Sequence, residues 1–188
     1  MIQYQVNPAS GQLLISEPFM LDPNFKRTVI MLCEHAEDSG TVGFILNKSL
    51  EVRVCDALLD FDVVQNELFY GGPVAQDTLH YIHRYGDVIE DSVVITKDIY
   101  WGGNFEQLGD MLRDGHIDPK GVKFFLGYSG WSPGQLQDEM EEKSWIISQA
   151  SGLYVFDTPR QELWKKVLND LGGEHKLITN YPEDPQLN

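Results

Sequence analysis

The chain has 188 residues, of which 42% are apolar and 11% aromatic, and this supply of core side chains excludes a globally disordered protein. Its 29 acidic and 14 basic residues give a net charge of −15, and the basic residues are scattered along the sequence. Because nucleic-acid binding takes most of its affinity from phosphate neutralisation, this charge argues against direct nucleic-acid binding.

The compartment follows from what the sequence lacks. No apolar run approaches the roughly 18–20 residues that span a bilayer, and the N-terminal MIQYQVNPASGQ lacks the regions of a secretory signal. Cys33 and Cys55 both have apolar neighbours and neither belongs to a CxxC or zinc-type spacing. We therefore expect a cytoplasmic protein with no membrane segment, no disulfide, no metal site and no cofactor.

Short segments rich in β-branched and aromatic residues predict nine strands. They cover residues 12–16, 28–34, 42–47, 67–70, 78–82, 92–96, 123–128, 145–148 and 153–156. Several are nearly continuous apolar runs, which is typical of strands buried on both faces. Helices are therefore expected to cover part of the sheet.

Capping signals predict the helices. A capping box at Thr158-Pro159-Arg160-Gln161 opens a helix that ends at Gly172, and Asn104 with Gln107 opens another that ends at Gly115. Further helices are predicted over 132–142 and 52–59. Helices and strands do not alternate regularly, so the pattern predicts an α+β fold with a mixed sheet. We expect one domain over residues 1–179, followed by a flexible C-terminal tail over 180–188.

The segment from Gly127 to Gln135 has the most unusual composition of the chain. Three glycines and a proline within nine residues indicate special backbone angles or a close approach, and a strand-to-helix turn directs backbone N–H groups to one point. A tight turn with a capping box at Ser132 explains the same residues. Trp131 stands where a nucleophile elbow needs glycine, and the P-loop and dinucleotide patterns are absent, so catalysis by Ser129 is disfavoured.

Other candidate sites are weaker. Cys33-Glu34-His35 ends an apolar strand, where alternation would place Cys33 and His35 on one face and Glu34 on the other. Loop-stabilising hydrogen bonds explain Glu34 and His35 better than acid–base catalysis does. His80 and His83 read as opposite faces of a strand, which disfavours a zinc site.

Two further aromatic–glycine corners lie at residues 70–74 and 101–104. Each is explained by a turn or by a ligand or strand approaching the backbone. With the segment at 127–135 they form a set of three, which could converge on one rim.

The motifs G-x-LLIS-x-P, DPNFKRTVIMLCEH, GFILNK, LFYGGPV and GYSGWSPGQL occur here in the order and spacing typical of one bacterial family. In this respect the chain resembles the YqgE/AlgH family from about Gly11 to Leu171. The resemblance implies a mixed, bifurcated β-sheet curled toward a partial barrel and flanked by helices. It implies no catalytic residues, and its transcriptional-regulator label is not matched by a helix-turn-helix pattern or a basic face.

These observations favour a non-enzymatic binding or regulatory protein that acts without direct DNA binding, on a protein partner or a small-molecule ligand. The alternative is a small hydrolase or transferase for a polar metabolite, with Glu34 or His35 as base and the 130–134 backbone as an oxyanion site. No residue is assigned as catalytic. The predicted ligand- or partner-binding surface comprises Glu34, His35, Asn47, Gly71, Gly72, Pro73, Ser129, Gly130, Trp131, Ser132, Gly134 and Gln135.

Overall fold

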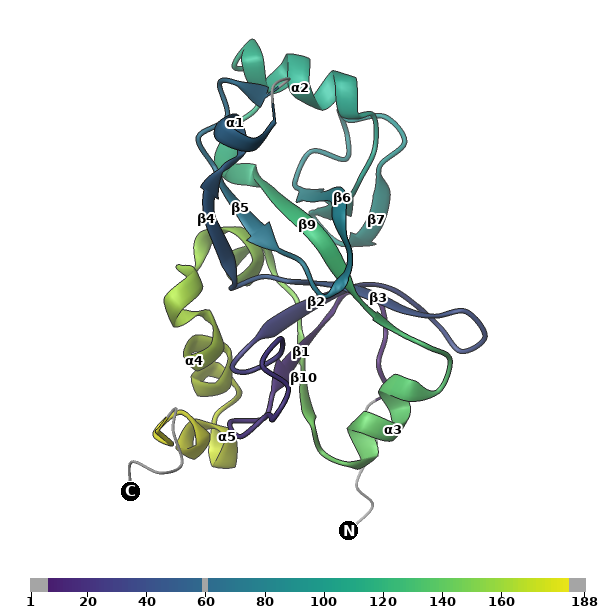
Figure 1. The fold of residues 1–188 in the computed structure, drawn as a ribbon, viewed down its shortest axis with the longest axis vertical. Coiled ribbons are helices and arrows are strands. Elements are labelled where there is room, and N and C mark those ends of the chain that lie inside the picture. The colour runs from purple at the N-terminus through teal and green to yellow at the C-terminus, as the bar shows by residue number, and fades with distance from the viewer. Residues whose placement is uncertain (1–6, 59–60, 183–188) are drawn as a thin grey trace.

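The computed structural model describes residues 7–58 and 61–182 as ten strands and several helices (Figure 1). In chain order the strands are β1 (Gln12–Ser16), β2 (Val29–Ala36), β3 (Gly40–Ile45), β4 (Ser49–Arg53), β5 (Glu67–Tyr70), β6 (Val74–His83), β7 (Val93–Thr96), β8 (Ile99–Trp101), β9 (Val122–Trp131) and β10 (Trp145–Gln149). The helices are α1 (Val54–Ala57), α2 (Phe105–Arg113), the 3-10 helix η2 (Pro119–Gly121), α3 (Gln135–Glu141), the π-helical turn η3 (Leu153–Asp157), α4 (Arg160–Leu171) and α5 (Gly173–Ile178).

Strand β9 is the branch point of the sheet. One of its edges pairs first with β5, in parallel at Phe124–Leu126, and then with β3, antiparallel at Ser129–Trp131. Its other edge pairs with β6. The resulting order is β10-β1-β2-β3-β9-β6-β8-β7, with β4 and β5 on the side branch. The sheet is mixed, mostly antiparallel and not closed, so the expected curl toward a partial barrel is not shown.

Helices cover the part of the sheet where strands such as β1 and β2 are apolar and buried on both faces, as predicted for several strands. Leu13 and Ile15 of β1 pack in one core with Leu163, Trp164, Val167 and Leu168 of α4. Leu14 between them faces the opposite core, which contains Leu136 of α3. Accordingly, α3 and α4 lie on opposite sides of β1, β2 and β10 (Figure 1). A third core lies under α2 and contains Leu108 and Leu112.

Several predicted elements differ from the structure. The predicted strand at 153–156 is wrong: η3 forms there, because Ser151 O accepts from the N–H groups of Tyr154 and Val155. Strands β4 and β8 and helix α5 were not predicted. In place of a helix over 52–59, β4 runs to Arg53 and α1 covers only Val54–Ala57, while Leu59 lies outside the described residues.

The capping predictions have mixed outcomes. Asn104 caps α2 as predicted, since its side chain accepts from Gln107 N at 3.0 Å. The box predicted at Thr158 does not form, because the Thr158 hydroxyl donates to Leu153 O at 2.8 Å and α4 begins without a side-chain cap.

Two further expectations concern membrane-spanning helices and the C-terminal tail. None of the helices within residues 7–58 and 61–182 is long and apolar enough to cross a membrane. Of the predicted tail, Tyr181 contacts Phe19 with ring centroids 5.3 Å apart, and residues 183–188 lie outside the described part of the chain.

Candidate functional site

Two glycines of the predicted surface, Gly71 and Gly72, lie at a close crossing of two backbone segments. A Cβ on Gly71 would stand 2.2 Å from Gly127 O, and one on Gly72 would stand 2.3 Å from Tyr128 O. The fully buried Ser129 donates from its hydroxyl to Gly71 O at 3.1 Å. Two of the three aromatic–glycine corners therefore meet, and their contact is between two segments of this chain. Pro73, beside them, is exposed.

The third corner lies elsewhere. A Cβ on Gly103 would meet Glu90 O at 2.7 Å, and Gly102 O lies 2.8 Å from the ring nitrogen of the buried His83. Burial lowers the pKa of His83, and the Gly102 carbonyl opposes this by favouring the protonated ring. Within residues 7–58 and 61–182, no cluster of three or more His, Cys, Asp or Glu side chains is placed to hold a metal ion.

Trp131 is a core residue. The predicted turn after Tyr128 is wrong, because β9 continues through Trp131, whose side chain is only 5% exposed. Its indole N–H donates to Glu139 Oε2 at 2.9 Å, and the indole N–H of Trp145 donates to the same oxygen at 2.7 Å. One carboxylate of α3 thus holds two tryptophans from β9 and β10.

Residues after Trp131 remain at the surface. Gln135 Oε1 accepts from the backbone N–H of Ser132 at 3.0 Å, which is the return half of a capping box. Gly134 precedes α3 with φ of +82° and has open space around its Cα. Gly130, Ser132, Gly134 and Gln135 are exposed, and a binding role for them stays a prediction.

Glu34, His35 and Asn47 lie at the other side of β3. A bulge after Leu32 changes the simple alternation expected for Cys33-Glu34-His35. His35 Nδ1 lies 2.7 Å from Thr41 Oγ1, and Thr41 pairs with Trp131, so the width of β3 separates His35 from β9. Asn47 accepts from Val29 N and donates to Arg27 O, both at 2.9 Å, which ties β2 to the end of β3.

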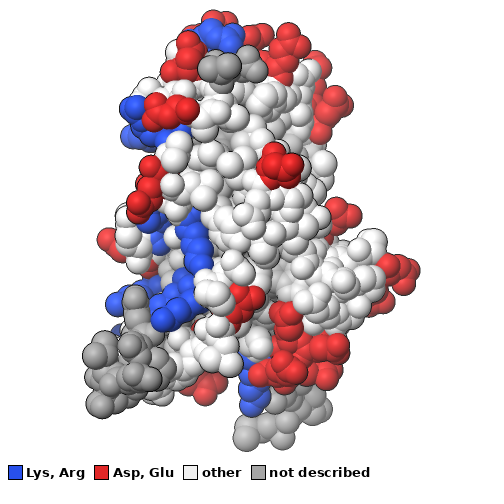
Figure 2. Space-filling model, in the orientation of Figure 1, with Lys and Arg blue, Asp and Glu red and all other residues white. Residues whose placement is uncertain are grey.

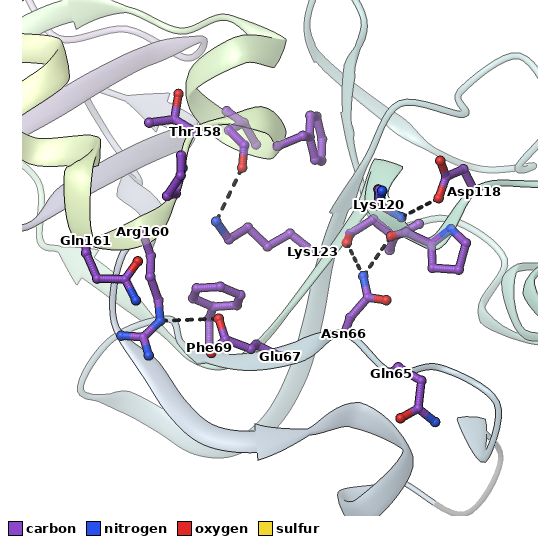
Figure 3. A pocket seen from close by; sticks show the side chains of 15 residues that line it. Gln65, Asn66, Glu67, Phe69, Asp118, Lys120, Lys123, Thr158, Arg160 and Gln161 are labelled. Atoms are coloured by element: carbon purple, nitrogen blue, oxygen red, sulfur yellow. Dashed lines mark hydrogen bonds and ion pairs between the residues drawn. The ribbon is translucent and has the colours of Figure 1, made fainter.

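A cavity lies at the start of β9, at the opposite end of this strand from Trp131, and Figure 3 shows its lining residues. It has a volume of about 560 Å³ and is lined by residues 65–67, 69, 118–120, 122, 123, 155, 156 and 158–161. We call it the Lys123 pocket. Its walls come from the loop before β5, from η2 with the start of β9, and from η3 with the start of α4.

Hydrogen bonds fix the walls of the Lys123 pocket. Asn66 donates from its side-chain amide to Pro119 O at 2.7 Å and to Val122 O at 2.9 Å. Asp118 accepts from Lys120 N at 2.9 Å and so caps η2. The Thr158–Leu153 bond closes η3 on the other side. The pocket is therefore preformed by backbone geometry.

The ammonium of Lys123 projects into this space. It donates to Val155 O at 3.3 Å and lies 4.1 Å from the centroid of the Phe69 ring. Burial lowers the pKa of Lys123 to about 7, Glu67 opposes that effect, and Arg160 adds to it. Both forms of the amine are thus present near neutral pH.

Arg160 supplies the second cation of the pocket. Its Nε lies 3.3 Å from Glu67 Oε2, and its side chain is 26% exposed. Within the described part of the chain, its two terminal Nη groups make no hydrogen bond. The pocket is lined by three cations and two carboxylates, the reverse of the balance in the whole chain. Figure 2 shows Lys and Arg side chains in a band on this face, where Figure 1 places β4, β5 and α4.

Lys48 provides a comparison within the same chain. Its ammonium donates to Pro23 O at 2.6 Å and to Asn24 O at 2.8 Å, and it is close enough to Asp22 to be stabilised by that charge. Burial lowers its pKa as well. Lys48 therefore fastens a loop with two short bonds, whereas Lys123 has one long bond and an open cavity in front of it.

The sequence predictions missed this pocket because its residues come from three separated segments. Two local signals were present: Lys123 is a charged residue at the start of the apolar run FFLG, and Arg160 lies in the first turn of a predicted helix. Neither signal indicates a cavity until β5, η3 and α4 are brought together.

The fold is α+β, with an open, branched sheet and a cationic cavity between β5, the start of β9, and α4. The chain belongs to the AlgH-like family, whose model matches residues 13–176. It is 46% identical over 179 residues to a UPF0301 protein of Chlorobaculum parvum, covering 95% of both chains. It is 44% identical to a UPF0301 protein of Cytophaga hutchinsonii, covering 95% of this chain and 98% of that one.

Solved structures agree with this assignment. The AlgH protein from Pseudomonas aeruginosa superposes with a TM-score of 0.71 at 26% identity, covering 97% of this chain and 98% of that one. Protein DIP2367 from Corynebacterium diphtheriae gives a TM-score of 0.77 at 22% identity, with 95% of both chains covered. The second likeness shows the fold alone.

Proposed function

We propose that this protein is a non-enzymatic binding protein and that its ligand is a small anion held in the Lys123 pocket. The observation that carries the proposal is the ammonium of Lys123, which faces a preformed cavity with a single 3.3 Å hydrogen bond. An ammonium has three donors, and burying one without partners is unfavourable. An anionic ligand would supply the missing acceptors.

The size and composition of the pocket support a small ligand. Its volume of about 560 Å³ lies in the range of small-molecule sites. Phe69 and Val155 provide apolar walls, and the guanidinium of Arg160 offers paired donors that suit a carboxylate or a phosphate. The local excess of cations would favour an anion against the repulsion of a chain carrying −15.

Thermal unfolding in a panel of small anions tests the proposal. The panel contains phosphate, citrate, pyruvate and lactate, and it is applied to the wild type, Lys123→Met, Arg160→Gln and Lys97→Met. A ligand at 100 times its Kd stabilises the folded state by about 2.7 kcal/mol, which is a readily measured rise in Tm. We expect at least one anion to raise the Tm of the wild type and of Lys97→Met, and not of the two pocket variants.

Lys97→Met is the matched control because it removes one exposed positive charge outside the pocket. Equal stabilisation of all four proteins would mean nonspecific anion binding and would overturn the proposal. So would the lack of any shift across the panel in the wild type.

A further inference from the structure

We infer that Lys123 is a carbonyl-reactive amine, and that the anion bound in the Lys123 pocket carries an aldehyde or ketone group that condenses with Nζ to form a reversible imine. This inference rests on the proposed function and narrows it to a class of ligand. The class is a small 2-oxo acid or a similar carbonyl compound with a carboxylate or phosphate.

The surroundings of Lys123 are those that keep an amine nucleophilic. A lysine attacks a carbonyl only as the neutral amine, and desolvation beside a second cation is a recognised way to populate that form. Lys123 lies against the Phe69 ring and Val155, with Arg160 close enough to disfavour its charge. The lowered pKa agrees with this geometry, because burial is its largest cause.

Access distinguishes this lysine from a structural one. Lys48 is also partly buried, but two short bonds to Pro23 O and Asn24 O occupy its ammonium. Lys123 leads from β9 into the open cavity and has one weak carbonyl partner (Figure 3). An incoming carbonyl carbon can therefore approach Nζ without breaking a structural hydrogen bond network.

The second cation positions the ligand. Arg160 from α4 and Lys123 from β9 line the same pocket, and Figure 3 shows Lys123 directed to Val155 O and the Arg160 guanidinium beside Glu67. If the carboxylate of a 2-oxo acid binds the Nη groups of Arg160, its carbonyl carbon is held in the pocket beside Nζ. In this arrangement Arg160 binds the anionic group of the ligand, and Lys123 adds to its carbonyl carbon.

The proposed step balances in atoms and electrons. The lone pair of the neutral Nζ forms a C–N bond to the carbonyl carbon as the C=O π bond breaks, and a proton passes from that nitrogen to the carbonyl oxygen to give a neutral carbinolamine. Loss of that oxygen as water, with a proton from nitrogen, forms the C=N bond. The sum is one amine and one carbonyl compound giving one imine and one water, and no oxidant or reductant takes part.

Reductive trapping on the full chain tests the inference. The wild-type protein is incubated at pH 7 with glyoxylate and sodium cyanoborohydride, which converts an imine at a lysine into carboxymethyl-lysine. Peptide mass spectrometry then gives the rate at each lysine in the same sample. The exposed Lys97 and Lys143 are internal controls, and Lys48 is the buried control. We expect Lys123 to be modified about tenfold faster than Lys97, Lys143 or Lys48.

A neutral aldehyde isolates the role of Arg160. Acetaldehyde lacks the carboxylate, so the preference for glyoxylate over acetaldehyde at Lys123 should exceed that at Lys97 in the wild type and fall to the Lys97 value in Arg160→Gln. Modification of Lys123 no faster than of Lys97 and Lys143 would overturn the inference. A fast reaction at Lys123 with no preference for glyoxylate would overturn the anionic part of the ligand class.

Lactate separates this inference from the proposed function, because it keeps the carboxylate of pyruvate but has no carbonyl to condense. If lactate and pyruvate stabilise the wild type and Lys123 is not trapped, the imine inference fails and the binding function stands. If no anion of the panel stabilises the protein and Lys123 is not trapped, both fail.

Discussion

At the scale of single residues, the contrast between two partly buried lysines shows how partners decide the role of a charge. Lys48 and Lys123 both lose hydration, yet only Lys48 recovers two short hydrogen bonds. The cost of placing Lys123 in the fold is consequently only partly offset, by one 3.3 Å hydrogen bond, the Phe69 ring and the charge of Glu67. A buried cation with a strongly shifted pKa at a cavity is a candidate for function.

Lys123 should also make stability depend on pH. Its pKa is about 7 in the folded chain against an ordinary value of 10.5, so the unfolded chain binds the proton more tightly between these values. The destabilisation is complete below about pH 7 and is relieved as pH rises toward 10.5. We expect Lys123→Met to be more stable than the wild type by about 1–2 kcal/mol at pH 6.5, with a smaller advantage at pH 9.5.

Urea unfolding at the two pH values measures this difference. The charged groups that face Lys123 are Glu67 from β5, Arg160 from α4, and Asp118 and Lys120 beside η2. Lys97→Met serves as the control and should follow the wild type at both pH values. A Lys123→Met variant whose advantage grows from pH 6.5 to 9.5 would contradict the assigned shift.

At the scale of elements, Glu139 joins α3 to two strands. Its Oε2 accepts from the indole N–H groups of Trp131 on β9 and Trp145 on β10. Removing the carboxylate leaves two buried donors without their acceptor, and each unsatisfied donor costs about 1–3 kcal/mol. We expect Glu139→Ala to lower the free energy of unfolding by about 3 kcal/mol and to change the tryptophan fluorescence of the folded protein.

Glu141→Ala is the matched control, since Glu141 is an exposed carboxylate on the same helix. It should change stability by less than about 0.5 kcal/mol. Equal effects of the two substitutions in a urea titration would show that the shared acceptor contributes little.

Local sequence signals predicted the elements that depend on neighbouring residues. Strands β1 and β5 have their predicted bounds, and Asn104 caps α2. The failures have tertiary causes. Residues 153–156 look like a strand, but only Val155 among them is fully buried, and Thr158 closes a helical turn instead of capping α4.

The candidate site was less predictable for the same reason. The sequence analysis selected Gly71, Ser129 and Trp131 because their segments are rich in glycine and aromatic residues. The structure explains these residue types by a backbone crossing at Gly71 and Ser129 and by the carboxylate that Trp131 shares with Trp145. A glycine that admits a ligand and a glycine that admits another strand have the same local pattern. The Lys123 pocket has almost no local pattern, since it forms only when three distant segments meet.

At the scale of the whole molecule, the net negative charge should prevent binding to DNA. The chain carries −15, and its cationic band on the face in Figure 2 surrounds a cavity of small-molecule size. A phosphate backbone gains little from such a surface. We expect no retardation of duplex DNA at 150 mM salt in a gel-shift assay, with a basic DNA-binding protein as positive control. Retardation that weakens steeply as salt is raised would contradict this expectation.

The branch at β9 has a consequence for biosynthesis. All three partners of this strand, β3, β5 and β6, precede it in the chain, and β1 pairs with β10, which follows it. A nascent chain that has emerged as far as β8 therefore contains β3, β5 and β6 but lacks β9, the strand with which all three of them pair. Long-range pairing of this kind delays folding. The ribosome-bound chain should thus be a better chaperone client before β9 emerges than after it, because a single late strand joins the two halves of the sheet.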